Sequence, residues 1–388
     1  MKSTVGVIGG GQLARMMIPP AVSLGVTIKV LEEVAGMSAE LAATGIGDYR
    51  DLDTVLAFAQ TVDVITFDHE HVPQHVLHAL IEAGVPVHPG PDALLYAQDK
   101  LLMRQKIMEL GLPSPDWAAV SNADELSAFL DVHGGRAVVK TARGGYDGKG
   151  VRVVDDKNGA DDWFIALAED GRGGSLIAEE LVDFVRELAQ QVARRPSGEI
   201  AAYPVVETVQ KDGVCAEVIA PAPTASDLAT GLDGSASTVA EVAREIAVRV
   251  AEGVGVTGML AVELFETRDG RVLVNELAMR PHNSGHWSID GAVTSQFEQH
   301  LRAVLDLPLG STRPRDAWSV MINVLGGPVG QLMQDRYPVV AGEFPAVKLH
   351  SYAKESRPGR KVGHVTVSGE RLDDVLADAR AAAAFFEG

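Results

Sequence analysis

The first hundred residues alternate short apolar runs with helical stretches, and this alternation limits the choice of fold more than any other feature of the chain. Residues 12–24 are expected to form the first helix. The runs expected to be strands are residues 4–8, 27–31, 62–67 and 85–88. Short strands separated by helices are typical of a parallel sheet with helices on both faces. We therefore predict a doubly wound, Rossmann-like α/β domain over residues 1–98.

The pattern changes after residue 98. An amphipathic helix over residues 99–110 is followed by Gly111, Pro113 and Pro115, which mark a domain junction. From there to about residue 310 we predict an α+β domain with one long helix, residues 237–254. Its expected strands are residues 137–140, 151–154, 175–180, 187–193, 201–206, 260–266 and 271–277. Residues 311–388 are expected to form a small mixed segment that ends in a helix over residues 372–386.

The charge balance narrows the range of partners. Asp and Glu outnumber Lys and Arg by 53 to 34, which gives a net charge of −19. Nucleic acid and anionic membranes need a basic field, so neither is expected as the main partner. The single cysteine, Cys215, excludes an internal disulfide and suits a reducing cytoplasm. Without a leader before the first strand or an apolar run of ~18 residues, we expect a cytoplasmic globular protein.

A glycine-rich turn joins the first expected strand to the first helix. Residues 9–14 read Gly-Gly-Gly-Gln-Leu-Ala and match G-x-G-x-x-A, with Glu32 and Glu33 about 20 residues further on. This is the dinucleotide fingerprint in its expected place, with N–H groups at a helix start that can bind an anion. The same glycines also suit a tight turn without a ligand, or an anion site for another compound.

A second glycine-rich loop follows the strand expected over residues 137–140. It contains four glycines together with Lys140, Arg143 and Lys149. Backbone donors and positive charge in a mobile loop can wrap phosphates, although the spacing differs from that of a Walker P-loop. Because Lys140 ends a strand with a buried pattern, we favour phosphate contact over a flexible hairpin with solvated side chains.

A pair of glutamates gives the clearest indication of chemistry. Asp269-Gly270 is the preferred sequence for a two-residue type I′ turn, so we predict a hairpin around it. The register of that hairpin puts Glu263 opposite Glu276, with Cβ atoms about 4.5–5.5 Å apart. Two carboxylates so close need a positive charge between them, and Mg²⁺ prefers carboxylate and phosphate oxygens. We predict a metal site, with a shared proton or an arginine bridge as the alternatives.

Three further polar clusters could bind ligands. Residues 280–287 are rich in cations, imidazoles and amides, and could hold a small oxyanion or cap a helix. The His-Glu-His run at residues 69–71 invites a zinc interpretation, but H-E-x-x-H spacing is absent and we favour Glu70 as a substrate contact. Residues 354–364 gather several cations, which indicates a phosphate-binding site more than a solvated loop.

Together these segments resemble the ATP-grasp superfamily and, more narrowly, the 5-(carboxyamino)imidazole ribonucleotide synthases of purine biosynthesis. The likeness covers nearly the whole chain, and it is most specific in residues 280–287 and 357–364. It implies an ATP-grasp fold in which residues 1–98 form a pre-ATP-grasp domain and residues 99–310 the ATP-grasp domain. A small lid would comprise about residues 113–182. Residues 311–388 would pack on the ATP-grasp domain as a substrate-binding segment.

The resemblance also implies roles for single residues. ATP would contact Lys100, Lys140, Gly145, Tyr146, Asp147, Gly148, Lys149, Gly150, Val151, Glu179, Glu180, Leu181, Val182, Glu187, Gln210, Asn275 and Glu276. Mg²⁺, or Mn²⁺ in its place, would bind Glu263 and Glu276. Bicarbonate would be held by Arg280, His282 and Asn283, with Tyr146 and Asp147 as catalytic residues on a closing loop. The ribonucleotide would contact Gly11, Gln12, Leu13, Glu70, Lys354, Arg360 and Lys361, the last three at its phosphate.

The implied reaction uses ATP to carboxylate 5-aminoimidazole ribonucleotide with bicarbonate, through carboxyphosphate, and a homodimer is implied as well. His71, Ala278 and Met279 depart from the family pattern, in which asparagine, asparagine and proline are common at these positions. The rival functions are a ligase with another acceptor, such as the formate-using glycinamide ribonucleotide transformylase, an NAD(P)-dependent oxidoreductase, and a non-catalytic nucleotide-binding regulator.

Overall fold

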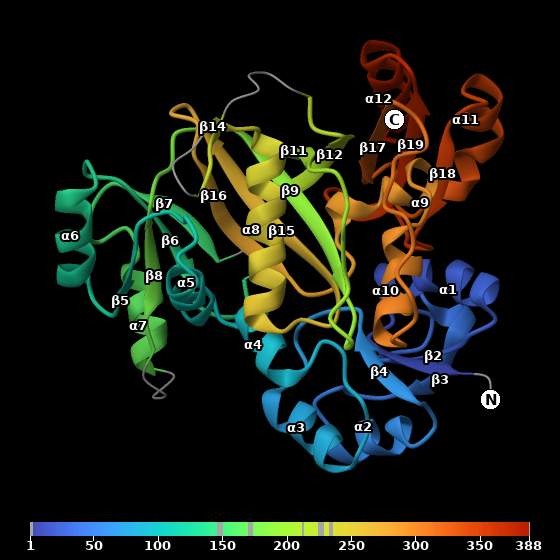
Figure 1. The fold of residues 1–388 in the computed structure, drawn as a ribbon, viewed down its shortest axis with the longest axis horizontal. Helices are drawn as coiled ribbons and strands as arrows, with labels where there is room; N and C mark the ends of the chain where they lie inside the picture. Colours follow the sequence, from blue (N-terminus) through green and yellow to red (C-terminus); the bar gives the residue numbers. More distant parts are fainter. Residues whose placement is uncertain are drawn as a thin grey trace.

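The computed structural model describes residues 3–145, 150–169, 174–211, 213–223, 229–232 and 236–387. Along the chain come a parallel sheet with its helices, a small antiparallel sheet, and a large antiparallel sheet that also contains the last strands. In Figure 1 the small sheet lies to the left of the large one, and the parallel sheet lies below at the right. A two-stranded ladder, β13 (Ala229–Thr230) with β14 (Ala236–Ser237), completes the strands of the described chain.

The amino-terminal sheet is parallel throughout, with the order β3-β2-β1-β4. Its strands are β1 (Thr4–Ile8), β2 (Thr27–Glu32), β3 (Ala43–Ile46) and β4 (Val64–Phe67). Its helices are α1 (Gln12–Leu24), η1 (Glu40–Ala42), α2 (Leu52–Ala59), α3 (Gln74–Glu82) and α4 (Pro91–Gln98). The α/β prediction for this part is confirmed, but the strand predicted for residues 85–88 is wrong. Val87 makes only one parallel bridge, to Ile65, because Pro86 and Pro89 lack the N–H groups that a longer ladder needs.

The small sheet is antiparallel and has the order β5-β8-β6-β7. Its strands are β5 (Trp117–Val120), β6 (Ala137–Thr141), β7 (Val151–Val154) and β8 (Leu176–Glu180), and its helices are α6 (Ala123–Val132) and α7 (Asp161–Glu169). Helix α5 (Lys100–Glu109) leads into this unit and is capped by Asp99, whose carboxylate accepts from the N–H groups of Leu101 and Leu102. The Nε of Arg143 lies 2.8 Å from the same carboxylate, so the start of the second glycine-rich loop is tied to the start of α5.

The large sheet has the order β16-β15-β9-β11-β12-β17-β19-β18, with β10 beside β9. Its strands are β9 (Phe184–Arg194), β10 (Ile200–Ala202), β11 (Val206–Lys211), β12 (Val214–Ala220), β15 (Gly258–Thr267), β16 (Val272–Ala278), β17 (Trp318–Leu325), β18 (Lys348–Ser351) and β19 (Lys361–Gly369). The remaining helices are α8 (Val239–Val254), η2 (Asn283–Gly285), α9 (Ser288–Gly291), α10 (Gln296–Val304), η3 (Met333–Arg336), α11 (Tyr337–Glu343) and α12 (Leu372–Glu387). The strands after residue 310 therefore continue the sheet that contains the glutamate hairpin.

Two predictions for this sheet need correction. The single strand predicted for residues 201–206 is wrong, because β10 and β11 are separate, and Pro204 between them cannot donate to a ladder. Strand β12 and the carboxy-terminal strands were not predicted at all. The long helix is confirmed as α8, which begins after a capping box between Thr238 and Glu241 and ends at Gly255 with φ 67°.

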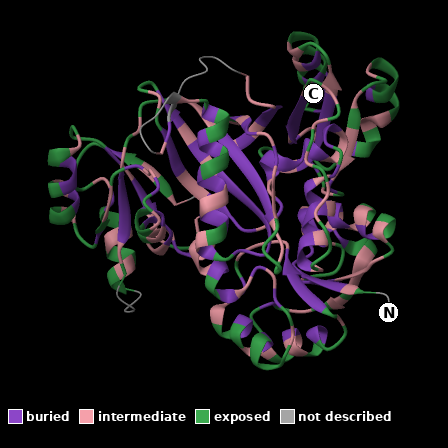
Figure 2. Cartoon of the chain, viewed as in Figure 1, coloured by how far each residue is buried: buried purple, intermediate pink, exposed green. Residues whose placement is uncertain are grey.

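Helix α8 covers one face of the large sheet (Figures 1 and 2). Its buried residues, among them Val242, Ile246 and Val250, pack in one cluster with Leu260 of β15 and with residues of α4 and α5. Figure 2 shows the sheet strands as mostly buried and the outer side of α8 as exposed. This cluster contains residues of the glutamate hairpin and of α5, the helix that precedes the small sheet. The hairpin and the connection to the small sheet therefore share one hydrophobic core.

The β15–β16 hairpin places the two glutamates opposite each other by a different route from the predicted one. Thr267 pairs with Arg271 around a three-residue loop, in which Gly270 has φ 82° and Asp269 does not have the positive φ that a type I′ turn requires. That loop alone would shift the register by one residue. An irregularity at Asn275 restores it, so Glu263 pairs with Glu276 as predicted, although the predicted turn type is wrong.

His300 links the first and the third sheets. Its Nδ1 accepts from the N–H of Met259 on β15 at 3.1 Å, so its Nε2 carries the proton of the neutral ring and donates to Oγ1 of Thr66 on β4 at 2.7 Å. Burial lowers the pKa of His300 to about 3. The folded protein therefore keeps this ring neutral where an unfolded chain, with an ordinary histidine pKa near 6.5, would protonate it.

This linkage predicts an acid-sensitive fold. Below pH 6.5 the unfolded chain binds more protons than the folded one, so the free energy of unfolding should fall as the pH drops from 6.5 toward 3. His300 alone should account for about 2 kcal/mol between pH 7 and pH 5. Urea unfolding at both pH values would measure this slope. His300→Gln should reduce the slope by that amount, while His75→Gln, an exposed control, should leave it unchanged; equal slopes in all three proteins would contradict the assignment.

Candidate active site

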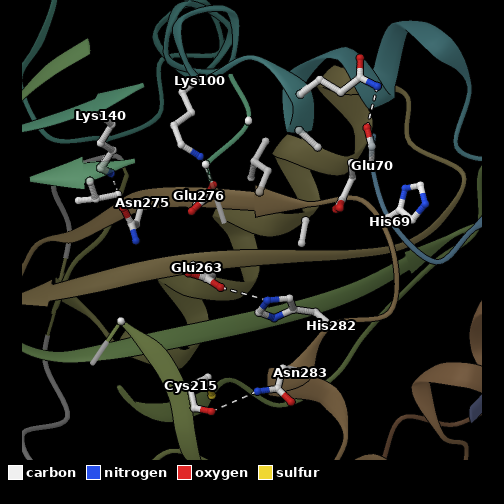
Figure 3. A pocket seen from close by; sticks show the side chains of 18 of the residues that line it. His69, Glu70, Lys100, Lys140, Cys215, Glu263, Asn275, Glu276, His282 and Asn283 are labelled. Atoms are coloured by element: carbon white, nitrogen blue, oxygen red, sulfur yellow. Dashed lines mark hydrogen bonds and ion pairs between the residues drawn. The ribbon is translucent and has the colours of Figure 1, made fainter. Parts of the chain in front are cut away.

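A cavity of about 910 Å³ lies where the three sheets meet, and Figure 3 shows part of its lining. Most of the residues singled out in the sequence line this cavity: Gly11, Gln12, Leu13, Glu70, Lys100, Lys140, Gly145, Val151, Glu179, Glu180, Leu181, Val182, Glu187, Gln210, Glu263, Asn275, Glu276, Arg280, His282, Asn283, Lys354 and Lys361. Gly150 and Arg360 do not line it. Tyr146, Asp147, Gly148 and Lys149 lie outside the described residues. One space thus contains nearly the whole predicted set.

The glutamate pair sits on the large sheet, with both carboxylates facing the cavity (Figure 3). Burial and the neighbouring carboxylates of Glu276 and Glu187 raise the pKa of Glu263 to about 8. Burial also acts to raise the pKa of Glu276, but Lys100 and Lys140 hold it below its ordinary value. Two carboxylates thus face each other in one cavity, and paired carboxylates of this kind are the ligands that a hard divalent cation prefers.

The register shift in β16 explains how two consecutive residues, Asn275 and Glu276, can both line the cavity. On a regular strand Asn275 and Glu276 would point to opposite faces of the sheet. The register shift at this point lets both line the cavity, where Asn275 Oδ1 accepts from Lys140 Nζ at 3.2 Å and Glu276 pairs with Lys100 (Figure 3). Bulges of this kind are enriched beside active sites because they redirect a side chain.

A chain of hydrogen bonds fixes the ring of His282. Its Nδ1 accepts from the N–H of Ser284 at 3.4 Å and lies 2.7 Å from the hydroxyl of the same residue, which in turn accepts from Gln191 Nε2. Burial, Arg280 and Lys361 lower the pKa of His282 well below its ordinary value, so the ring is neutral. Its remaining proton is therefore on Nε2, 3.2 Å from Oε1 of Glu263 (Figure 3). The imidazole presents a donor to the cavity.

Arg280 is held at the strand end by a carboxylate from the amino-terminal domain. Its Nε lies 2.6 Å from Oε2 of Glu70. Glu70 is itself fixed through its backbone, because Gln98 Nε2 donates to the carbonyls of Glu70 and Val72 at 2.7 and 2.8 Å. Beyond Arg280, the amide nitrogen of Asn283 donates to the carbonyl of Cys215 at 3.3 Å (Figure 3). A guanidinium, an imidazole and an amide thus converge on one end of the cavity, which suits a small oxyanion.

The first glycine-rich turn is already occupied by side chains of the protein. Asp68 Oδ1 accepts from the N–H of Ala14 at the start of α1, at 2.8 Å, and a Cβ at Gly11 would collide with the same carboxylate. Glu33 Oε2 lies 3.5 Å from the N–H of Gly10. A dinucleotide pyrophosphate would need these donors and would meet two carboxylates instead. The geometry therefore disfavours the dinucleotide interpretation.

The carboxy-terminal cations separate into two groups. Lys354 and Lys361 line the cavity, and Lys354 Nζ donates to Gln12 Oε1 at 3.0 Å, across the boundary with the amino-terminal domain. Arg360, in contrast, donates to the carbonyl of Glu355 at 3.2 Å and does not reach the cavity lining. Arg357 is exposed. Of these cations, only the two lysines line the cavity.

The histidine-rich segment after β4 does not gather into a metal site. His69 lies 3.3 Å from Glu33, and His75 and His78 are exposed on α3. Within the described ranges, no group of three or more His, Cys, Asp or Glu side chains is placed to hold a metal ion. A cation at Glu263 and Glu276 would therefore need oxygen ligands from a bound molecule or water as well.

Several residues of the site were not found from the sequence. They are Asp68 at the helix start, Gln98 and Ser284 as supports, and Arg104, whose buried guanidinium contacts Glu179. Cysteine 215 also lines the cavity. For Asp68, its place directly after a parallel strand was a usable signal, since ligand and loop contacts concentrate at carboxyl ends of strands. The others depend on contacts between distant parts of the chain and have no local signature.

Comparison with known proteins matches three segments of the chain to family models. Residues 1–98 match the ribonucleotide synthetase preATP-grasp domain, residues 105–297 the ATP-grasp domain, and residues 319–378 the phosphoribosylaminoimidazole carboxylase C-terminal domain. These matches confirm the expected fold class.

Whole-chain relatives give the same result. The N5-carboxyaminoimidazole ribonucleotide synthase of Mycobacterium tuberculosis is 46% identical over 383 residues, covering 98% of this chain and 86% of the relative. That of Bacillus subtilis is 35% identical over 385 residues, covering 97% and 94%. The Aspergillus clavatus enzyme in complex with ADP and 5-aminoimidazole ribonucleotide superposes with a TM-score of 0.86 at 29% identity, covering 99% and 98%. The Thermus thermophilus synthetase superposes with a TM-score of 0.84 at 34% identity, covering 99% of each chain.

The reactivity of Cys215, the sole cysteine, can test how far this part of the cavity wall is buried. Burial raises the pKa of the Cys215 thiol to about 12. At pH 8 its thiolate fraction should be about a thousandfold lower than that of a free cysteine. Ellman's reagent should therefore label the native protein at least a thousandfold more slowly than the protein in guanidinium chloride. Cys215→Ser should give no signal in either state, and rapid labelling of the native protein would contradict the burial of this thiol.

Proposed function

Because this chain belongs to the family of N5-carboxyaminoimidazole ribonucleotide synthases, we propose that its cavity binds Mg²⁺ with ATP, bicarbonate and 5-aminoimidazole ribonucleotide together. The protein is an ATP-dependent carbon–nitrogen ligase of purine biosynthesis. It converts 5-aminoimidazole ribonucleotide to N5-carboxyaminoimidazole ribonucleotide. The observation that supports the proposed site is one continuous cavity lined by paired carboxylates, lysines and an arginine–imidazole–amide group.

ATP is proposed to lie between the small and the large sheet. Lys140, from β6, and Lys100, from the start of α5, provide positive charge beside the glutamate pair, where the triphosphate would end. Residues 180–182, at the end of β8 and just after it, line the cavity wall, and their backbone groups are proposed to contact the adenine ring. Glu187, hydrogen-bonded to Gln210, lies further along the same wall and is proposed for the ribose. The loop that contains Tyr146 and Asp147 is proposed to close over the phosphates.

Mg²⁺ is proposed to bind Glu263 and Glu276. The donor set fits a hard cation, since two carboxylates face each other across β15 and β16 and both line the cavity. Two protein carboxylates leave further coordination positions for phosphate oxygens and water. Bound Mg²⁺, or Mn²⁺ in its place, would neutralise charge on the transferring phosphoryl group.

Bicarbonate is proposed to bind between Arg280, His282 and Asn283. Arg280 is oriented by Glu70 and can bind an oxyanion through its remaining N–H groups. His282 directs an N–H toward the same space. These groups would orient a bicarbonate oxygen toward the γ-phosphorus of ATP, so that carboxyphosphate and ADP form. The closed loop would exclude water from this labile intermediate.

The ribonucleotide is proposed to enter from the side of the amino-terminal domain. Lys354 and Lys361 are its proposed phosphate ligands, with Gln12 beside them and Glu70 toward the ribose. The exocyclic amine would then attack the carbonyl carbon of carboxyphosphate, or CO₂ released from it. The new C–N bond forms as the C–O bond to phosphate breaks, and the departing phosphate can take the proton that the amine loses. Arg280 would stabilise the negative oxygen during this step.

The remaining proposals concern the oligomeric state and the cellular location of the enzyme, and the rival functions. A homodimer and a cytoplasmic location are proposed from the family resemblance and from the single buried cysteine. Among the helices of the described chain, none has the length and apolar character needed to cross a bilayer. The rival oxidoreductase function is disfavoured by the carboxylates of Asp68 and Glu33 at the glycine turn. A non-catalytic regulator is disfavoured because the chain belongs to a family of ATP-dependent ligases.

The first experiment measures ADP release with Mg²⁺, ATP and bicarbonate, with and without 5-aminoimidazole ribonucleotide. The ribonucleotide should stimulate release strongly, and EDTA should abolish it. Glu276→Gln should reduce the rate by about two orders of magnitude or more, because one metal ligand and one negative charge are lost. Release that is indifferent to the ribonucleotide would point to another acceptor. No release under any condition would favour a regulator.

A second prediction separates the carboxy-terminal cations. Lys361→Ala should raise KM for the ribonucleotide at least about tenfold, because a phosphate ligand in the cavity is removed. Arg360→Ala, one residue away but bonded to the Glu355 carbonyl, should change KM less than about threefold. Steady-state kinetics at saturating ATP and bicarbonate would measure both. Equal effects of the two substitutions would contradict the assignment of the phosphate site.

A further inference from the structure

Arg104 is fully buried on helix α5, beneath the end of the cavity assigned to ATP phosphates. Its Nε lies 2.6 Å from Oε1 of Glu179, on β8 of the small sheet. Its Nη1 donates to the carbonyl of Val274, on β16 of the large sheet, at 2.7 Å. A single guanidinium therefore connects three elements: the helix that leads into the small sheet, the small sheet itself and the strand of the glutamate pair.

Glu179 is shared between two cations. Oε1 faces Arg104, and Oε2 lies 2.7 Å from Nζ of Lys140. Burial acts to raise its pKa, but Arg104 and Lys140 together lower that pKa to about 2, so this carboxylate is charged at neutral pH. Its side chain is only 4% exposed. Although the resemblance implied that Glu179 contacts ATP, its side chain contacts these two cations.

The charge count of this group determines what Lys140 can offer to a ligand. Arg104 and Lys140 are positive and Glu179 is negative, so the three together carry one positive charge. Without Arg104, the carboxylate would pair with Lys140 alone and the group would be neutral. In a cavity shielded from water, such pairing is strong and would compete directly with a phosphate for the ammonium group. With Arg104 present, the single negative charge of Glu179 is divided between two cations.

The second contact of Arg104 acts on the glutamate strand. Val274 directly precedes Asn275, where the register of β16 shifts, and β16 is an edge strand of its sheet. The N–H of Val274 donates to the carbonyl of Pro113 at 2.9 Å, so both backbone groups of Val274 are held from the side of α5. Asn275 Oδ1 then receives Lys140 Nζ. The irregular segment that directs Asn275 and Glu276 into the cavity is braced from outside its sheet.

We propose that Arg104 is a positioning residue for phosphoryl transfer, which holds Glu179 so that Lys140 keeps its charge for the ATP phosphates and braces β16 at the glutamate pair. This role rests on the proposed contact between Lys140 and the phosphates. Arg104 does not itself touch substrate.

The test measures binding of Mg²⁺ with a non-hydrolysable ATP analogue by calorimetry. Arg104→Met should weaken binding roughly tenfold to a hundredfold, and Lys140→Met by a similar factor. The double variant Arg104→Met with Glu179→Gln removes the carboxylate that would capture Lys140 and restores a net charge of one. It should recover most of the affinity that Arg104→Met loses, and the remaining deficit measures the lost contact with the Val274 carbonyl on β16. Arg104→Lys, which keeps the charge, should also rescue binding in large part.

The controls separate this role from general stability. Lys106→Met, on the same helix α5, should leave binding unchanged, and KM for the ribonucleotide should be unaffected in Arg104→Met. A double variant that binds as weakly as Arg104→Met would overturn the proposal, as would normal binding by Arg104→Met. Normal binding by Lys140→Met would instead remove the proposed phosphate contact itself. If Arg104→Met does not fold, Glu179→Gln gives the deciding result: binding weaker than wild type overturns the proposal.

Discussion

The structure depends on the balance of charge around two facing glutamates. Burial and the neighbouring carboxylates of Glu276 and Glu187 raise the pKa of Glu263, so ionising both members of the pair is favoured by cations close by. Lys100 and Lys140 approach from the small-sheet side, and Arg280 extends the strand of Glu276 itself. No single domain contains the complete set. The fold brings charged side chains that are far apart in the sequence close enough to interact electrostatically in one cavity.

The same constraint explains why so many of the supporting contacts cross domain boundaries. Glu70 of the amino-terminal domain orients Arg280, and Gln12 of the same domain receives Lys354 from the carboxy-terminal segment. His300 links β4 to β15. The first two pairs hold groups that face the cavity, whereas the His300 contacts join two sheets away from it. For the first two pairs, contact between domains and site geometry therefore depend on the same hydrogen bonds.

Much of the fold could be predicted because its signals are local. The strand–glycine–helix unit at residues 4–24, the capped helix α8 and the final helix α12 all have patterns that end where the structure ends them, within one or two residues. The pairing of Glu263 with Glu276 was predicted correctly, but for a partly wrong reason. The turn is one residue longer than predicted, and the register shift at Asn275 compensates for that extra residue. Arg104 could not be found, because a buried cation in a helix looks like a solvated one until its partners on other elements are known. The glycine turn was ambiguous because Asp68, which occupies it, lies 54 residues away from Ala14.

The large sheet joins the glutamate hairpin at one edge to β19 near the other, through β9, β11, β12 and β17. Glu263, Glu276 and Lys361, which begins β19, therefore belong to one hydrogen-bonded framework. The small sheet is connected to it through α5 and side-chain contacts, without strand pairing. A relative motion of the small sheet would change the enclosure of the proposed nucleotide site, while the distance between the glutamate pair and Lys361 stayed constant. The large sheet would thus keep the proposed reacting groups at a fixed spacing, and the small sheet would set how far water reaches them.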